Sequence, residues 1–97
     1  MNNAVVIAEQ DAQSWVGNHP DWKIVDDGLQ VSFRFKDFVG AFSFLTRVAM
    51  VAEEQNHHPH IENMYNEVTL TLSTHDAGNK ITEKDLKLAE AINELKE

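Results

Sequence analysis

The chain has 97 residues, which is enough for one domain with a modest core. Hydrophobic residues make up 42% of it, which is normal for a globular protein and argues against a disordered chain. The lack of cysteine excludes disulfides, thiolate catalysis and cysteine-based zinc sites. The 8 basic and 16 acidic residues give a formal net charge of -8, which argues against nucleic acids and anionic membranes as partners. No stretch approaches the roughly 18 apolar residues of a membrane span. We therefore expect a single domain over residues 1–97, located in the cytoplasm.

The first third of the chain predicts a helix followed by a hairpin. Apolar residues over 4–17 predict a weak helix, and the breaker at 18–21 ends it. Residues 22–25 predict a strand, and the turn signal at 26–28 joins it to a second one. Over residues 29–36, apolar and polar side chains alternate one by one. This period of two predicts a half-buried antiparallel strand.

The middle of the chain predicts a long amphipathic helix. Asp37 is a plausible N-cap, because the spacing of apolar residues changes there from two to three and four. The helix should end near Gln55-Asn56, since Pro59 disfavours helical geometry just before it. The predicted core-facing residues of this helix are Phe38, Ala41, Phe42, Leu45, Val48, Ala49 and Ala52.

The last third predicts a second hairpin and a final helix. A turn falls near Tyr65-Asn66, and the alternation around Val68, Leu70 and Leu72 predicts a strand after it. Thr82 can cap the last helix, whose core face comprises Leu86, Leu88, Ala89, Ile92 and Leu95. The order helix, hairpin, helix, hairpin, helix predicts an α+β fold. We expect a two-layer sandwich in which three helices pack on one face of a four-stranded antiparallel sheet.

Four of the five histidines, His57, His58, His60 and His75, lie within 19 residues. Histidine can donate and accept protons near neutral pH, so a cluster of them suits acid–base chemistry. His75 is expected at the end of a strand, turned away from the helices, where it could line a cleft with the His57 loop. From the residues alone, two interpretations are equally open: the histidines form a functional cluster, or they are ordinary surface histidines. A metal site using these four side chains is the rival, but the spacing has no helical i,i+4 pair, so we expect no metal.

Several motifs together resemble the pterin-4a-carbinolamine dehydratase family, over roughly residues 22–95. His-His-Pro at 57–59, followed by Thr-His at 74–75, is a specific signature when an aromatic helix precedes it. The other matching positions are Phe35-Lys36-Asp37-Phe38, Ala41-Phe42, the run from Phe44 to Ala49, Ala52-Glu53, Tyr65-Asn66, Val68, Ser73, Asp85 and Leu88-Ala89.

This resemblance implies a reaction and roles for individual residues. The substrate would be 4a-hydroxytetrahydrobiopterin, which loses water to give quinonoid dihydropterin during tetrahydrobiopterin regeneration, with no cofactor. His57 and His75 would be the acid–base pair, and His58 would bind and orient the pterin with a share in proton transfer. Glu53, one helical turn before His57, could orient that histidine. The positions bordering the substrate would be Pro59, Thr74, Asp76 and Ala77, together with the three histidines.

The resemblance also implies a homodimer or homotetramer. On the long helix, Val39, Phe44, Met50 and Val51 lie off the predicted core stripe, which is more apolar surface than a single covered face requires. The alternative function is a non-catalytic binding or regulatory module of the same fold that acts as a protein dimerisation partner. The presence of all three histidines favours the enzyme, because a scaffold has no need of them.

Overall fold

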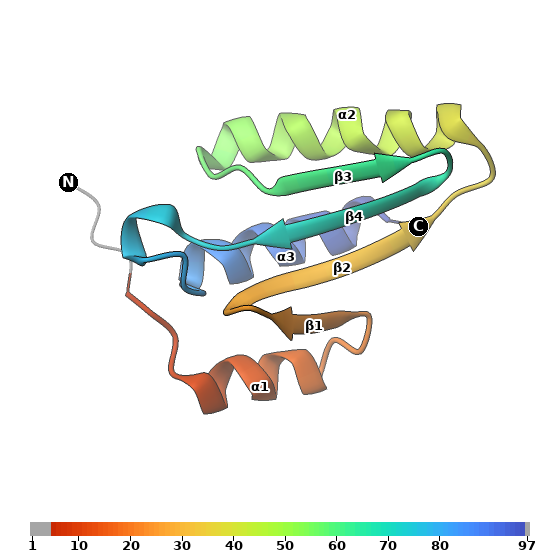
Figure 1. The fold of residues 1–97 in the computed structure, drawn as a ribbon. Coiled ribbons are helices and arrows are strands. Elements are labelled where there is room, and N and C mark those ends of the chain that lie inside the picture. The colour runs from red at the N-terminus through yellow and green to blue at the C-terminus, as the bar shows by residue number, and fades with distance from the viewer. Residues whose placement is uncertain (1–4, 97) are drawn as a thin grey trace.

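The computed structural model describes residues 5–96, which form one four-stranded antiparallel sheet with three α-helices (Figure 1). The strand order is β1-β2-β4-β3, so the inner strands of the two hairpins pair with each other at the centre. Within the described residues, no helix is both long and apolar enough to cross a membrane. The elements in chain order are α1 (Glu9–Gly17), β1 (Trp22–Val25), β2 (Gly28–Arg34), α2 (Phe38–Gln55), β3 (His60–Met64), β4 (Glu67–Leu72), a 3-10 turn η1 (His75–Ala77) and α3 (Glu83–Leu95).

The sheet has one apolar face and one polar face, as the alternation predicts. Leu29 pairs with Leu72 and Val31 with Leu70, and all four side chains are buried beneath the helices. Polar residues of the same strands point to the open face, where their side chains hydrogen-bond across the β2–β4 pair. The predicted two-layer α+β fold is therefore confirmed. Strand β2 ends at Arg34, two residues earlier than expected.

Helix α1 begins at Glu9, later than the expected start, and residue 4 lies outside the described part of the chain. Residues 5–8 run extended instead. The Ile7 N–H donates to the Ile81 carbonyl at 2.9 Å, and Val6 forms an isolated antiparallel bridge with Thr82. The chain before α1 is thus held against the segment that leads into α3.

Helix α2 is capped as predicted, but its core face is rotated from the predicted one. The Gly40 N–H donates to an Asp37 carboxylate oxygen at 2.8 Å. Phe44, expected outside the core stripe, is fully buried, whereas Phe38 and Phe42 are 49% and 53% exposed. The buried residues of this helix are Ala41, Phe44, Leu45, Val48 and Ala52, and Ala49 is exposed.

The rotation of α2 follows from aromatic packing. The ring of Phe44 lies 5.2 Å from that of Phe33 and 5.0 Å from that of Phe35, which come from β2 and the segment after it. Burying Phe44 removes its ring from water and also gives it two aromatic partners at once. Phe38 and Phe42 contact each other on the surface instead.

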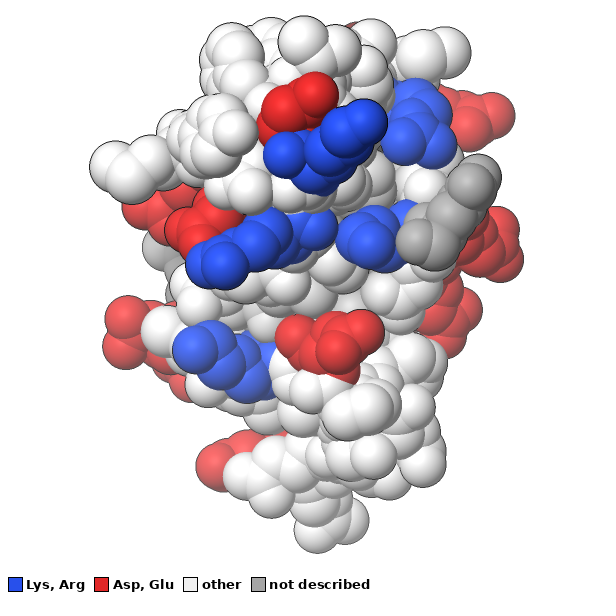
Figure 2. Space-filling view, turned by 90° about the vertical axis from the view of Figure 1, so that its right-hand side faces the viewer, with Lys and Arg blue, Asp and Glu red and all other residues white. Residues whose placement is uncertain are grey.

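The side of the molecule that carries the C-terminus, the β3–β4 turn and the start of α2 displays a group of Lys and Arg side chains (Figures 1 and 2). Asp and Glu side chains lie beside them, so the basic groups do not form an uninterrupted positive surface. One pair across β2 and β4 is Arg34 with Glu67. The α2–β3 connection, which carries His57 and His58, and the η1 turn, which carries His75, lie at the opposite end of the molecule (Figure 1).

Candidate active site

His57 and His58 are placed by the way α2 ends. Asn56 takes a left-handed conformation with φ of 53°, and the His57 N–H donates back to the Ala52 carbonyl at 3.0 Å. Asparagine accepts this conformation more readily than most residues, so it ends the helix sharply. The following Pro59 then directs the chain into β3. Both histidines therefore sit on a short connection between two rigid elements.

His75 lies on the 3-10 turn η1 and not on a strand, because β4 stops at Leu72. The alternation of burial nevertheless continues, so that Thr74 is buried and His75 is exposed. The Thr74 N–H donates to the Lys80 carbonyl at 2.8 Å, which closes the loop behind the turn. His75 is thus turned outward, as expected, but by a loop rather than by a strand.

The three histidines line one polar cavity of about 300 Å³. Its lining combines the end of α2, the end of β4, η1 and the start of α3, in the residues Asn56, His57, His58, Ser73, Thr74, His75, Asp76 and Lys84. Of the positions expected to border a substrate, Pro59 and Ala77 are not part of this lining. Asn56, Ser73 and Lys84 belong to it although the sequence motifs assigned them no role. A volume of this size lies at the lower end of small-molecule sites.

A buried carboxylate holds the His57 imidazole. Nε2 of His57 lies 2.6 Å from Oδ1 of Asp85, whose side chain is fully buried, while the His57 side chain is 11% exposed. The other carboxylate oxygen, Oδ2, accepts the Thr74 hydroxyl and the Thr82 N–H, each at 2.8 Å. Three polar groups from three segments therefore converge on Asp85. Such a partner fixes the orientation of an imidazole ring.

Glu53 pairs with His58 and not with His57, contrary to the expectation. Its Oε2 lies 2.7 Å from Nε2 of His58, and both side chains are largely exposed. The reason is the change of direction at Asn56, which carries His58 back over the last turn of α2. The residue that orients His57 is Asp85. The family resemblance includes this position but implies no role for it.

His60 does not join the other clustered histidines. It begins the edge strand β3, where it pairs with Thr71 of β4, and it does not line the cavity. Among residues 5–96, no group of three or more His, Cys, Asp or Glu side chains has an arrangement that could hold a metal ion.

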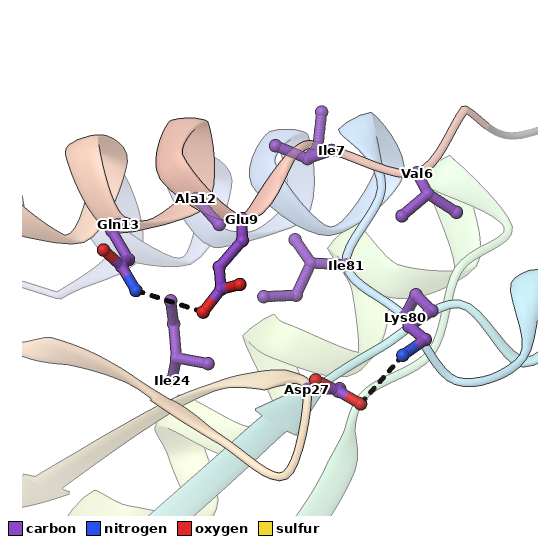
Figure 3. A pocket seen from close by; sticks show the side chains of 9 residues that line it. All are labelled: Val6, Ile7, Glu9, Ala12, Gln13, Ile24, Asp27, Lys80 and Ile81. Atoms are coloured by element: carbon purple, nitrogen blue, oxygen red, sulfur yellow. Dashed lines mark hydrogen bonds and ion pairs between the residues drawn. The ribbon is translucent and has the colours of Figure 1, made fainter.

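A second cavity, of about 480 Å³, lies between α1, the β1–β2 turn and the segment before α3 (Figure 3). Its floor is apolar, formed by side chains that include Ile24 and Ile81. Its charged groups already have partners in the protein: Lys80 Nζ lies 3.0 Å from Asp27, and the Gln13 amide donates to Glu9 at 3.4 Å. No histidine lines it, so the cavity of the three histidines is the candidate active site.

The structure is thus that of a small α+β protein with a cavity lined by three histidines. Imidazole side chains can donate protons to a bound molecule or accept protons from it. A family model described as pterin 4 alpha carbinolamine dehydratase matches residues 6–95. A protein of Prochlorococcus marinus (strain MIT 9313), named "Putative pterin-4-alpha-carbinolamine dehydratase", is 47% identical over 92 residues, which are 95% of each chain. A protein of the same name from Burkholderia pseudomallei (strain 1710b) is 58% identical over 69 residues, which are 71% of this chain and 67% of that one.

A solved structure agrees with these relatives. The crystal structure of a "transcriptional coactivator/pterin dehydratase" from Brucella melitensis matches with a TM-score of 0.87 and 36% identity, over 94% of this chain and 98% of that one. The chain therefore belongs to the pterin 4 alpha carbinolamine dehydratase family, as its motifs predicted.

Proposed function

We propose that this protein is a hydro-lyase that dehydrates 4a-hydroxytetrahydrobiopterin to quinonoid dihydropterin, and so supports tetrahydrobiopterin regeneration in the cytoplasm. The observation that carries the proposal is the meeting of His57, His58 and His75 at one cavity. Membership of the family supplies the substrate class. The acid–base roles are assigned to these imidazoles because no other side chain in the lining exchanges protons as readily at neutral pH.

The reaction needs one proton acceptor and one proton donor. An imidazole takes the proton from N5 of the pterin, and the electron pair left on nitrogen forms the N5–C4a double bond. The C4a–O bond breaks as the hydroxyl receives a proton from a second imidazole in its protonated form, and water leaves. Hydroxide is a poor leaving group, so the donor is essential, and positioned proton transfer contributes about 10²–10⁴ in rate. Two histidines supply both functions without a cofactor.

The other lining residues fit a bound pterin. The exposed His58 imidazole, held by Glu53, lies at the cavity and can orient the ring. Asp76 is a carboxylate in the same lining, and a carboxylate can accept hydrogen bonds from the amino-pyrimidine part of a pterin. The Thr74 hydroxyl, in contrast, donates to Asp85, so Thr74 borders the cavity without offering that hydroxyl proton to a substrate.

The test is a stopped-flow dehydration assay on synthetic 4a-hydroxytetrahydrobiopterin. The protein should accelerate water loss above the spontaneous rate, and the rate should saturate with substrate. His60→Ala is the control, because it removes a neighbouring histidine that does not line the cavity, and it should leave the rate unchanged. A parent protein that gives no acceleration would exclude the hydro-lyase function and leave the binding-module alternative.

The alternative function, a binding or regulatory module acting as a dimerisation partner, has one supporting observation: the Brucella melitensis relative is also titled a transcriptional coactivator. Both functions are compatible with the homodimer or homotetramer that we propose. Val39 and Met50 of α2 are 71% and 67% exposed, and Phe42 lies between them on the same side of the helix. Phe44, which was expected to contribute to this surface, is buried and takes no part in it.

Met50→Glu is expected to dissociate the oligomer, because a charge placed in an apolar interface loses its hydration without a partner. Sedimentation equilibrium would show a lower mass for this variant than for the parent. Val5→Glu is the matched control, because Val5 is also an exposed apolar residue but lies before α1 and not on α2. This variant should keep the mass of the parent. A parent that already sediments as a monomer would contradict the oligomer.

A further inference from the structure

The direction of each hydrogen bond around Asp85, from donor to acceptor, follows from which of its two atoms carries a proton. Each threonine hydroxyl has a single proton to donate. The Thr74 hydroxyl lies 2.8 Å from Oδ2 of Asp85, and a carboxylate can only accept, so the Thr74 proton is used there. The Thr74 and Thr82 hydroxyl oxygens are 2.6 Å apart, and the proton between them must therefore come from Thr82.

The chain of donors continues into the backbone of α3. The Thr82 oxygen accepts the Lys84 N–H at 3.2 Å, while the Thr82 N–H donates to Oδ2 of Asp85 at 2.8 Å. Every hydrogen bond in the network thus points toward the Asp85 carboxylate. Thr74 is 3% exposed, and Thr82 and Asp85 are fully buried, so water does not compete for these partners.

The same argument gives the direction of the hydrogen bond between His57 and Asp85. Oδ1 of Asp85 has no proton to give, so the 2.6 Å contact requires His57 to donate its Nε2–H. A neutral imidazole then carries no proton on Nδ1. Nδ1 has no hydrogen-bond partner within residues 5–96. No buried side-chain nitrogen or oxygen in that range is without a partner, so Nδ1 is not buried, and His57 lines the cavity.

We propose that Thr82, acting through Thr74 and Asp85, is a positioning residue that fixes His57 as the Nε2–H tautomer and so makes Nδ1 of His57 the base of the dehydration. This inference rests on the proposed function. Nδ1 takes the proton from N5 of the pterin. The proton for the departing hydroxyl then comes from a different imidazole of the cavity, that of His75 or His58.

The position of Thr82 is fixed from outside the cavity. The Ile7 N–H donates to the Ile81 carbonyl, and Val6 bridges to Thr82, so the extended segment before α1 holds the residues that precede the cap. Figure 3 shows Ile7 and Ile81 on these neighbouring segments, where both line the second cavity. Lys80 is held to Thr74 by a backbone hydrogen bond on the other side. Thr82 therefore has little freedom to turn its hydroxyl away from Thr74.

The test uses ¹⁵N-labelled protein and long-range ¹H–¹⁵N spectra of the imidazoles, with His57 assigned by comparison with His57→Gln. In the parent, His57 is expected as the Nε2–H tautomer. Thr82→Ala removes the hydroxyl that holds Thr74 and takes the cap N–H out of its fixed place, so the Asp85 carboxylate can turn away from Nε2. The variant should therefore give a mixture with the Nδ1–H tautomer and lower kcat roughly tenfold with little change in KM. Thr82→Ser, which keeps the hydroxyl, should restore both. Thr46→Ala, which removes an exposed hydroxyl on α2, should change neither.

Capping is separated from positioning by Thr82→Gly, because glycine is an adequate N-cap but has no hydroxyl. This variant should fold and still show the tautomer mixture. An Nδ1–H tautomer in the parent, or an unchanged parent-like spectrum in both Thr82→Ala and Thr82→Gly, would overturn the inference. These spectra require no turnover, so they decide the positioning role of Thr82 separately from the assay. An inactive parent would remove the proposed function and the role of Nδ1 as a base, and would leave the tautomer result standing.

Discussion

Alanine at position 57 or at position 75 is expected to slow the catalysed dehydration by about 10²–10⁴-fold, because each variant removes one of the two proton-transfer groups. The effects should fall mainly on kcat, since the remaining lining still binds the ring. Stopped-flow rates on 4a-hydroxytetrahydrobiopterin, measured for both variants and the double variant, give the comparison. The double variant should lose little more than the worse single one, because groups that act in one step are not additive.

The fold can be monitored alongside these rates. His75 is exposed on η1 and has no side-chain hydrogen bond among the described residues, so its loss should leave the unfolding transition unchanged. His57 is packed against Asp85, so His57→Ala requires a circular dichroism spectrum to show that the fold is intact. Parent-like rates in both variants would contradict the acid–base assignment. A loss in His57→Ala alone would move the donor role from His75 to His58.

Asp85→Ala is expected to lower the free energy of unfolding by about 3–5 kcal/mol. The substitution leaves the Thr74 hydroxyl, the Thr82 N–H and the His57 ring without their acceptor in a site that water does not reach. Buried groups left unpaired in this way cost more than a lost surface contact. Because small domains are stable by only about 5–15 kcal/mol, urea unfolding followed by circular dichroism should show a large fall in the midpoint.

Two variants isolate the cause of this fall. Asp37→Ala also removes an aspartate that caps a helix, but on the exposed surface of α2, and should cost only about 1 kcal/mol. Asp85→Asn keeps the shape and one acceptor oxygen, so it should be more stable than Asp85→Ala while losing much of the dehydration rate. Equal stability losses in Asp85→Ala and Asp37→Ala would show that Asp85 acts only as a helix cap.

The sequence carries a signal for the start of α3 at Thr82 and Asp85. Thr82 was predicted to cap the last helix, and the structure confirms this cap. Asp85 stands three residues later, which is the spacing of a capping box, in which the acidic side chain returns to the cap residue. This spacing places the carboxylate at the start of α3. It does not predict that the second oxygen meets His57, which lies 28 residues earlier.

Phe44 and Glu53 illustrate the limit of spacing arguments on a helix. The three-and-four spacing of α2 allows more than one apolar face, and Phe38, Phe42 and Phe44 cannot all face the core. The aromatic rings of Phe33 and Phe35 decided between them. Glu53 is one turn from His57, but the left-handed residue that ends the helix brings His58 to it instead.

The sequence by itself determined the elements of this protein, their order, the buried faces of its central strands and its family. These depend on periods of two and 3.6 residues, on caps and turns, and on a signature of neighbouring residues, all of which are local. Only the tertiary structure decided the rotation of α2, the partners of His57 and His58, and the residues that line the cavity. Those depend on which side chains from distant segments share a buried volume, and spacing along the chain carries no information about that.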